Sequence, residues 1–345
     1  MISWRKKVTY VYILIILLSQ ILPFVQSEMV DTQVLVFSSI DHDEIICCGL
    51  EQNTEPSVLE QWYITHEQIK FASLVSDTMT IQFIDGFTLV LFDVTSLLIN
   101  APISKIENKH SLLDLQSHYC SEVPIGNSAL LLNPSEYLYG NRHCRKMINT
   151  LLNNGYNIEY FSNEDVDISF LRYNLTSDIV YMNTHAGYWD VNGDKKSGSI
   201  VIATGEYWTN ETELMYPFEY NHKLIVKGMV GTQSFVCFTP AFIDYYYDPY
   251  DMPDSLIYMA TCHAGYDESM ATAFLDSGAR TYIGWTQDTF FWINSRTSVQ
   301  SFRLFSLGFT AKQVCTLIGY GGFFNFVFQS KLTYYGDKEY TILHH

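Results

Sequence analysis

The sequence predicts an α/β fold with a mostly parallel sheet, preceded by a smaller β-rich region. From Ser128 onward, short apolar runs alternate with amphipathic stretches of helical period, which is the order that builds a parallel sheet covered by helices. Before about Val123, short strand-like runs are separated by polar turns. Hydrophobic residues make up 48% of the 345 residues, which is ample for the core of such a fold.

The first 27 residues have the layout of a secretory signal peptide. Three basic residues at positions 5 to 7 precede an apolar run over 8–25, and cleavage is expected after Ser27. The run is nearly long enough to span a bilayer, so an uncleaved N-terminal anchor is the alternative. Either interpretation predicts a secreted or cell-surface protein, which contacts a membrane only if the segment is retained.

Charge and cysteine content limit the possible partners and cofactors. The net charge of −17 becomes 17 − 37 = −20 without the three basic residues of the signal, which argues against nucleic acid and anionic lipid. Seven cysteines leave at least one thiol unpaired, and both three disulfides and buried free thiols fit this count. Cys-x-x-Cys pairs are absent, and we expect no metal and no cofactor.

Residues 28–125 are predicted to form a β-rich N-terminal domain or pro-segment. The expected strands are Gln33–Ser38, Asp43–Cys48, Trp62–Thr65, Met79–Ile84 and Phe87–Phe92. The last two should form a hairpin, because Asp85-Gly86 between apolar runs is a strong turn signal. The histidines of this region are scattered and indicate no catalytic site.

Residues 126–345 are predicted to form the second domain, with an insertion at 188–255. Its expected strands are Ser128–Asn133, Tyr156–Phe161, Asp178–Thr184, Ser199–Thr204, Lys223–Val230, Ser234–Thr239, a strand from Leu256 ending at Cys262, and Thr281–Trp285. Its expected helices are Asn141–Asn154, Val166–Tyr173, one that begins near Asp267 and ends at Gly278, Asn294–Gly308 and Ala311–Gly319. Asp244–Asp254 is predicted to be an acidic aromatic loop, whose charge suits a basic side chain in a substrate.

Two reactive side chains follow buried strands of this domain. His185 comes directly after Asp178–Thr184, and Cys262 ends the strand that begins at Leu256. Because the carboxyl ends of parallel strands line the crevice of such sheets, both should emerge at one edge if their strands are neighbours. A histidine beside a thiol favours the thiolate and then protonates a leaving amine. We therefore predict a Cys-His dyad, with the N–H groups of Ala186 and Cys262 facing the oxyanion.

Two metal interpretations are weaker. Residues 190–194 (Asp-Val-Asn-Gly-Asp) resemble the start of a calcium loop, but the glycine is misplaced and Val201 replaces the bidentate glutamate. A hairpin turn at Asn192-Gly193 is the simpler interpretation. His263 is not expected to share a metal with Cys262, because neighbouring residues on a strand point to opposite faces.

The stretch from about Ser128 to Ile318 resembles the caspase–gingipain–legumain group of cysteine peptidases (clan CD), most of all its gingipain-type, secreted prokaryotic members. Residues 183–187 (Asn-Thr-His-Ala-Gly) match the histidine motif, and residues 260–265 (Ala-Thr-Cys-His-Ala-Gly) match the cysteine motif. Residues 273–285 resemble the helix and strand that follow the nucleophile. The resemblance implies a caspase-like three-layer α/β/α sandwich, with Cys262 as nucleophile and His185 as general acid and base. Ala186 departs from the glycine that is usual in the group.

These features predict an extracytoplasmic cysteine endopeptidase that acts on a protein or peptide through a thioester. Several gingipain-like peptidases cleave after basic residues, and the resemblance extends this expectation to the present chain. Among substrate contacts we expect Trp285 and Asp288. A transpeptidase of the same group is a less favoured possibility. The alternative from another class is a catalytically inactive cell-surface binding module with the same fold, which the alanine at position 186 favours.

Overall fold

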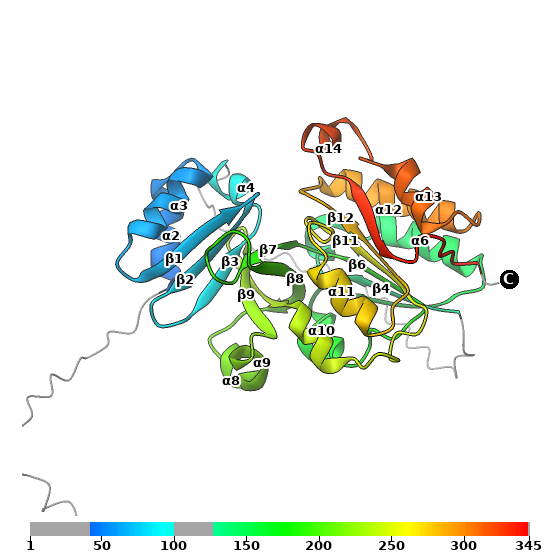
Figure 1. Ribbon diagram of the computed structural model, residues 1–345, viewed down its shortest axis with the longest axis horizontal. Coiled ribbons are helices and arrows are strands. Elements are labelled where there is room, and N and C mark those ends of the chain that lie inside the picture. The colour runs from blue at the N-terminus through cyan, green and yellow to red at the C-terminus, as the bar shows by residue number, and fades with distance from the viewer. Residues whose placement is uncertain (1–41, 100–126, 344–345) are drawn as a thin grey trace, which may run out of the picture. The chain divides into compact units, whose positions relative to one another are not determined.

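The computed structural model describes residues 42–99 and 127–343 (Figure 1). The predicted signal peptide, the strand expected at Gln33–Ser38 and Cys120 lie outside these residues. Within the two described ranges, no helix is both long and apolar enough to cross a membrane. The chain has an α/β fold, and its described strands form one six-stranded and one seven-stranded sheet.

The six-stranded sheet is the predicted, mostly parallel one. Its order is β13-β12-β11-β6-β4-β5, and only the β12–β13 pair is antiparallel. The strands are β4 (Ser128–Asn133), β5 (Asn157–Ser162), β6 (Ile179–Asn183), β11 (Leu256–Ala260), β12 (Thr281–Trp285) and β13 (Leu332–Gly336). The sequence predicted all of these except β13, although β11 ends before Cys262 and leaves the thiol in a loop.

Helices cover both faces of this sheet, because its strands are apolar on both sides (Figure 1). Successive residues of β4 show the division, since Leu130 packs in one core and Leu131 in the other. One face contacts α7 (Ile168–Leu171), α10 (Pro240–Tyr246) and α11 (Ser269–Asp276), and the other contacts α6 (Arg142–Leu152), α12 (Phe291–Phe305) and α13 (Ala311–Ile318). Because α10 extends to Tyr246, the predicted acidic loop at 244–254 is partly helical.

The seven-stranded sheet is assembled from two distant stretches of the chain. Its order is β1-β2-β3-β9-β10-β8-β7, with the strands β1 (Ile69–Val75), β2 (Thr78–Phe83), β3 (Thr88–Leu91), β7 (Ala186–Asp190), β8 (Gly198–Tyr207), β9 (Ile225–Val230) and β10 (Gln233–Phe238). The two stretches join through parallel pairing of β3 with β9, where Val90 lies opposite Gly228. Strands from the predicted N-terminal domain and from the predicted insertion therefore share one sheet.

Two strands predicted before residue 66 are wrong, because both segments are helical. Asp43–Cys48 lies in α2 (His42–Gln52) and Trp62–Thr65 in α3 (Pro56–Thr65). Acidic residues in the first turn of α2 and a proline at the start of α3 favour helices at these places. The β2–β3 hairpin is confirmed, and Gly86 has the positive φ of 94° that its turn requires.

The remaining short helices are α4 (Val94–Ile99), α5 (Glu136–Tyr139), η2 (Asn163–Asp165), α8 (Thr212–Met215), α9 (Pro217–Asn221) and α14 (Phe323–Val327).

The two sheets meet at a two-residue connection. β6 ends at Asn183 in the six-stranded sheet, and β7 begins at Ala186 on the edge of the seven-stranded sheet. Thr184 and His185 form the link, and each bonds to Ala203 of β8 through the threonine hydroxyl (2.8 Å) and the histidine carbonyl (2.9 Å). The histidine singled out in the sequence is thus held by both sheets.

Candidate functional site

The candidate site lies at the carboxyl edge of the six-stranded sheet. β6 and β11 are parallel neighbours whose register extends to Asn183 opposite Ala260. His185 and Cys262 each follow two residues after these positions, so the condition for their emergence at one edge, that their strands are neighbours, is met. α5, which follows β4, adds Tyr139 to the same edge.

Buried amide side chains tie these strand ends together. Asn183 donates to Asn133 Oδ1 (2.8 Å), while Asn294 donates to Asn183 Oδ1 (3.2 Å) and to the carbonyl of Ala260 (2.7 Å). Trp285 completes the network, because its indole N–H donates to Asn294 Oδ1 (2.9 Å). A fully satisfied buried network of this kind fixes the strands that carry His185 and Cys262.

Trp285 and Asp288, the two expected substrate contacts, lie in different environments. Trp285 is completely buried in the core, a position that does not fit the expected contact with substrate. The Asp288 side chain is 40% exposed and lies beside the thiol. Of the two, only Asp288 presents a side chain at the surface of the site.

His185 has a partner on each ring nitrogen. Its Nδ1 lies 3.1 Å from Asp93 Oδ2, and its Nε2 lies 3.2 Å from the Tyr139 hydroxyl. A carboxylate on Nδ1 favours the tautomer with a proton there and leaves Nε2 for proton transfer. Asp93 follows β3 of the seven-stranded sheet, in a left-handed conformation with φ 51°. Sequence reasoning missed both Asp93 and Tyr139, because nothing in the local pattern relates either residue to position 185.

The Cys262 thiol is held by the loop after β12. Its Sγ accepts the backbone N–H of Thr289 at 3.3 Å and lies 3.6 Å from the Thr289 carbonyl, to which it donates. Among the described residues, the hydrogen bonds of this thiol therefore go to Thr289 and not to His185. The structure brings the two predicted catalytic residues to one edge without joining them directly.

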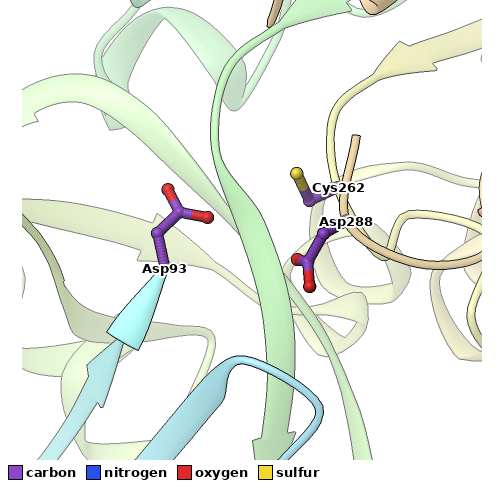
Figure 2. Close-up of side chains that lie close together, drawn as sticks. All are labelled: Asp93, Cys262 and Asp288. Atoms are coloured by element: carbon purple, nitrogen blue, oxygen red, sulfur yellow. The ribbon is translucent and has the colours of Figure 1, made fainter. Parts of the chain in front are cut away.

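Carboxylates surround the thiol. The Sγ of Cys262 and one carboxylate oxygen each of Asp93 and Asp288 all lie within 4.8 Å of one another (Figure 2). Burial raises the pKa of Cys262 well above its ordinary value, and the charges of Asp93, Asp288 and Asp77 raise it further. The Thr289 N–H acts in the opposite direction and does not offset them. The thiol is therefore protonated at neutral pH, whereas reactive cysteines usually have a lowered pKa.

The carboxylates themselves differ in pKa. Burial, assisted by the charges of Asp288 and Asp93, raises the pKa of Asp77 to about 6 despite hydrogen bonds from Thr95. Burial acts in the same direction on Asp93, but the hydrogen bond and charge of His185 outweigh it, and the pKa of Asp93 is lowered. Asp93 is thus an ionised partner for His185.

His263 reaches the same cluster through Asp288. Because β11 ends at Ala260, His263 lies in a turn with φ 55°, and the opposite-face argument for separating it from Cys262 was wrong. Its buried Nε2 lies 2.6 Å from Asp288 Oδ1. Asp93, Cys262 and Asp288 are spaced so that they could hold a metal ion, although each already has a protein partner in His185, Thr289 or His263.

Asp190 closes a hairpin with its own carboxylate. Its Oδ1 accepts the N–H groups of Gly193 (2.9 Å) and Asp194 (3.2 Å), and its Oδ2 accepts that of Lys195 (2.7 Å) and the Ser73 hydroxyl. These donors use the oxygens that a calcium ion would need. The β7–β8 turn is therefore a hairpin of the kind that the sequence favoured over a calcium loop.

The Ala186 N–H, the predicted oxyanion donor, is not used in the sheet. Ala203 N donates to the His185 carbonyl, so Ala186 and Ile202 form a non-hydrogen-bonded pair of the antiparallel ladder. In such a pair, the N–H points away from the partner strand. As β7 is the edge strand of this sheet, its Ala186 N–H makes no ladder bond to another strand within residues 42–99 and 127–343.

Cys48, Cys144, Cys237, Cys262 and Cys315 form no disulfide, which excludes three disulfides among seven cysteines. Cys144, Cys237 and Cys315 are buried, and burial raises the pKa of Cys144 and of Cys315 to about 12. These thiols behave as core residues. The thiol at the sheet edge is Cys262.

No protein-family model matches the sequence, and no curated protein matches it. Its motifs and the geometry of the site therefore carry the functional interpretation.

Proposed function

We propose that the protein is an extracytoplasmic cysteine endopeptidase with Cys262 as nucleophile, His185 as general acid and base, and Asp93 as the residue that orients His185. The observation that carries this proposal is the contact of His185 Nδ1 with the Asp93 carboxylate at the sheet edge that also bears Cys262. A carboxylate on one ring nitrogen of a histidine beside a thiol is a recurring catalytic arrangement. Helices on both faces of the six-stranded sheet support the caspase-like, three-layer interpretation.

The reaction requires Cys262 and His185 to leave the partners that they have in this structure. Cys262 Sγ leaves Thr289 and Nε2 of His185 leaves Tyr139, so that the imidazole takes the thiol proton. The sulfur then attacks the peptide carbonyl carbon, and the N–H groups of Ala186 and Cys262 face the resulting oxyanion. His185 returns the proton to the leaving amine as the C–N bond breaks. Water, activated by the same imidazole, hydrolyses the thioester and restores the thiol.

The carboxylates around Cys262 favour a basic residue in the substrate. Asp77, Asp93 and Asp288 raise the pKa of the thiol, and a lysine or arginine side chain placed among them would counter this effect. Asp288 is the partly exposed member of the cluster at the loop after β12, and it is our candidate for receiving the basic group. In this proposal, substrate binding itself promotes formation of the thiolate.

A catalytically inactive binding module is the second candidate. It is favoured by the raised pKa of Cys262 and by the hydrogen bonds that join this thiol to Thr289 instead of His185. The alanine at position 186 favours it as well. The same acidic cluster would then bind a basic peptide without cleaving it.

Thiol labelling of the full, reduced protein separates the two candidates. A lysyl chloromethyl ketone and iodoacetamide are compared, and peptide mapping identifies the modified cysteine, with exposed Cys47 as internal reference. We expect the lysyl compound to modify Cys262 at least about tenfold faster than Cys47, and His185→Ala to remove that advantage. His222→Ala, at an exposed histidine on another part of the fold, is the matched control. Equal labelling of the two cysteines, independent of His185, would establish the binding module.

A further inference from the structure

Two segments near the candidate site carry large apolar side chains that are exposed to solvent and lie close to one another. One segment lies at the start of α12 and the other in and just after α14. The exposed members are Phe290, Trp292, Phe323, Phe324, Phe326, Val327 and Phe328. Single exposed apolar residues are ordinary, whereas a contiguous group marks a binding surface.

Four of these side chains form a continuous surface, which we call the aromatic platform: Phe290, Trp292, Phe324 and Phe328. The ring of Phe290 lies 5.6 Å from that of Phe324 and 5.9 Å from that of Phe328, and Trp292 lies 6.0 Å from Phe324. All four are between 44% and 56% exposed. The platform thus presents ring surface to solvent while its members support one another.

The platform is built on the loop that holds the Cys262 thiol. Thr289 bonds Sγ, and the next residue, Phe290, belongs to the platform. Phe291 stacks on Tyr139, with ring centroids 4.0 Å apart, and the hydroxyl of Tyr139 contacts His185. Trp292 belongs to the platform again. In this one segment, Thr289 contacts Cys262 directly and Phe291 reaches His185 through Tyr139, while the residues that alternate with them belong to the aromatic platform.

The second segment is fixed to the same loop. Asn325 is completely buried in α14, and its amide donates to the Thr289 hydroxyl at 2.9 Å. Beyond α14, the Ser330 hydroxyl donates to the carbonyl of Gln287 (3.0 Å), and Lys331 N donates to the hydroxyl of Thr286 (3.0 Å). These bonds hold the platform in a set position relative to Cys262.

We propose that the aromatic platform binds an aromatic or large aliphatic side chain of the peptide substrate, close to the residue whose carbonyl meets Cys262. This inference rests on the proposed peptidase function and adds a second determinant of its substrate. Neighbouring residues of an extended peptide are only about 3.3 Å apart along the chain. A peptide carbonyl at Sγ therefore brings adjacent side chains to the loop that carries Phe290.

Charge favours a peptide over the other occupants. Residues 319–331 (Gly-Tyr-Gly-Gly-Phe-Phe-Asn-Phe-Val-Phe-Gln-Ser-Lys) contain no acidic residue, while Asp77, Asp93 and Asp288 lie around the thiol. One substrate with a basic and an apolar side chain matches both halves of this site. An anionic membrane surface is disfavoured by the net charge of −17.

The test uses two peptidyl chloromethyl ketones that end in lysine and carry either phenylalanine or alanine at the two preceding positions. We expect the phenylalanine compound to modify Cys262 roughly 30-fold faster, because it buries an additional aromatic side chain. The double variant Phe324→Ser/Phe328→Ser should reduce this ratio below about threefold and leave the iodoacetamide rate unchanged. Tyr173→Ser, at a side chain that is 69% exposed elsewhere, is the matched control.

Binding is measured separately, so that failure of the peptidase function does not decide the result. Fluorescein-labelled peptides with the same phenylalanine or alanine pair are titrated into the Cys262→Ala variant, and anisotropy gives both dissociation constants. The inference is supported if the phenylalanine peptide binds roughly tenfold more tightly and if Phe324→Ser/Phe328→Ser removes this preference, even when the thiol is unreactive. Equal binding of the two peptides overturns the inference, whether or not Cys262 reacts.

The same double variant tests the other occupants. Sedimentation velocity reports self-association, and co-sedimentation with phosphatidylcholine vesicles reports lipid binding. If the serine substitutions change either of these and leave the phenylalanine preference intact, the platform binds a second copy or a membrane, and the inference is wrong. If they change only the peptide preference, the inference stands.

Discussion

The two sheets differ in the longest separation along the chain between paired strands. In the six-stranded sheet, β4 and β5 are neighbours, as are β11 and β12, and each pair is joined by a helix that packs on the sheet. In the seven-stranded sheet, β3 pairs with β9 across more than a hundred residues of sequence. The first sheet supplies the nucleophile, and the second supplies Asp93 on His185. The candidate site therefore needs both the local and the long-range part of the fold.

The largest expected effects measure what each sheet contributes to catalysis. His185→Ala, at the end of β6, should lower kcat/KM for a lysine-containing fluorogenic peptide by at least about 10³-fold. Asp93→Asn, after β3, should lower it by roughly 10 to 100-fold, because the imidazole loses its orienting charge. Asp85→Asn, at another carboxylate that pairs with a histidine of the same region, is the control. Full activity of Asp93→Asn would mean that the seven-stranded sheet is only a scaffold.

A substitution at the junction of the two stretches tests whether they unfold together. In β9, a Cβ on Gly228 would lie 2.2 Å from Cys237 Sγ and 2.6 Å from the Phe92 ring. Gly228→Ala should therefore destabilise the fold by about 2 kcal/mol in urea unfolding. Gly322→Ala should be near neutral, since the nearest atom is the flexible end of Arg296 at 3.3 Å. Two separate transitions by fluorescence and circular dichroism would show that the stretches fold independently.

Asp288→Asn should separate thiol reactivity from turnover. Removing this carboxylate lowers the pKa of Cys262, so its iodoacetamide labelling at pH 8 should rise by about fivefold. Cleavage of a lysine-containing peptide should fall by roughly tenfold, because the basic side chain loses its partner. Asp276→Asn, at an exposed position on α11, is the control. A parallel change in both rates would assign Asp288 no role in substrate binding.

The smallest expected effect concerns Asp77, on the turn between β1 and β2. Its folded pKa of about 6 exceeds the unfolded value near 3.9, so the folded state binds the proton more tightly between these values. Its contribution to stability is present below pH 4 and is lost as pH rises through 6. After allowance for solvent screening, Asp77→Asn should be more stable than the native chain by about 1 kcal/mol at pH 7.5 and equal to it at pH 4. Chemical unfolding at both pH values measures this, with exposed Glu51→Gln as the control. Identical differences at the two pH values would refute the assignment.

The contrast between local and long-range strand pairing also explains which parts of the structure could be predicted from the sequence. The bounds of β4 and β12 match the prediction, because a buried parallel strand has a strong local signal. Helices α2 and α3 were mistaken for strands, since their short apolar runs suit either structure and packing decided between them. The positions of Cys262 and His185 followed from strand ends. Asp93 did not, because its place beside His185 depends on the pairing of β3 with β9.

The environment of the thiol could not be predicted from the local sequence pattern either. Cys262 and His263 were assigned to one strand, but the strand ends at Ala260 and the turn brings His263 to Asp288. The raised pKa of Cys262 results first from burial and then from three carboxylates of separate segments. The same is true of Tyr139, whose hydroxyl reaches His185 from the other side. Such convergence is a property of tertiary structure, and no spacing in the sequence encodes it.

The pairing of β3 with β9 has a consequence for limited proteolysis. A cut between Ile99 and Ser128 would yield two chains that remain associated, since β3 stays hydrogen-bonded to β9 and Asp93 stays on His185. Discarding the smaller chain would uncover the backbone of β9, an apolar edge that invites aggregation. We therefore expect residues 42–99 to stay bound after such a cut, so that a nicked form should retain its full mass under native conditions and separate only in denaturant.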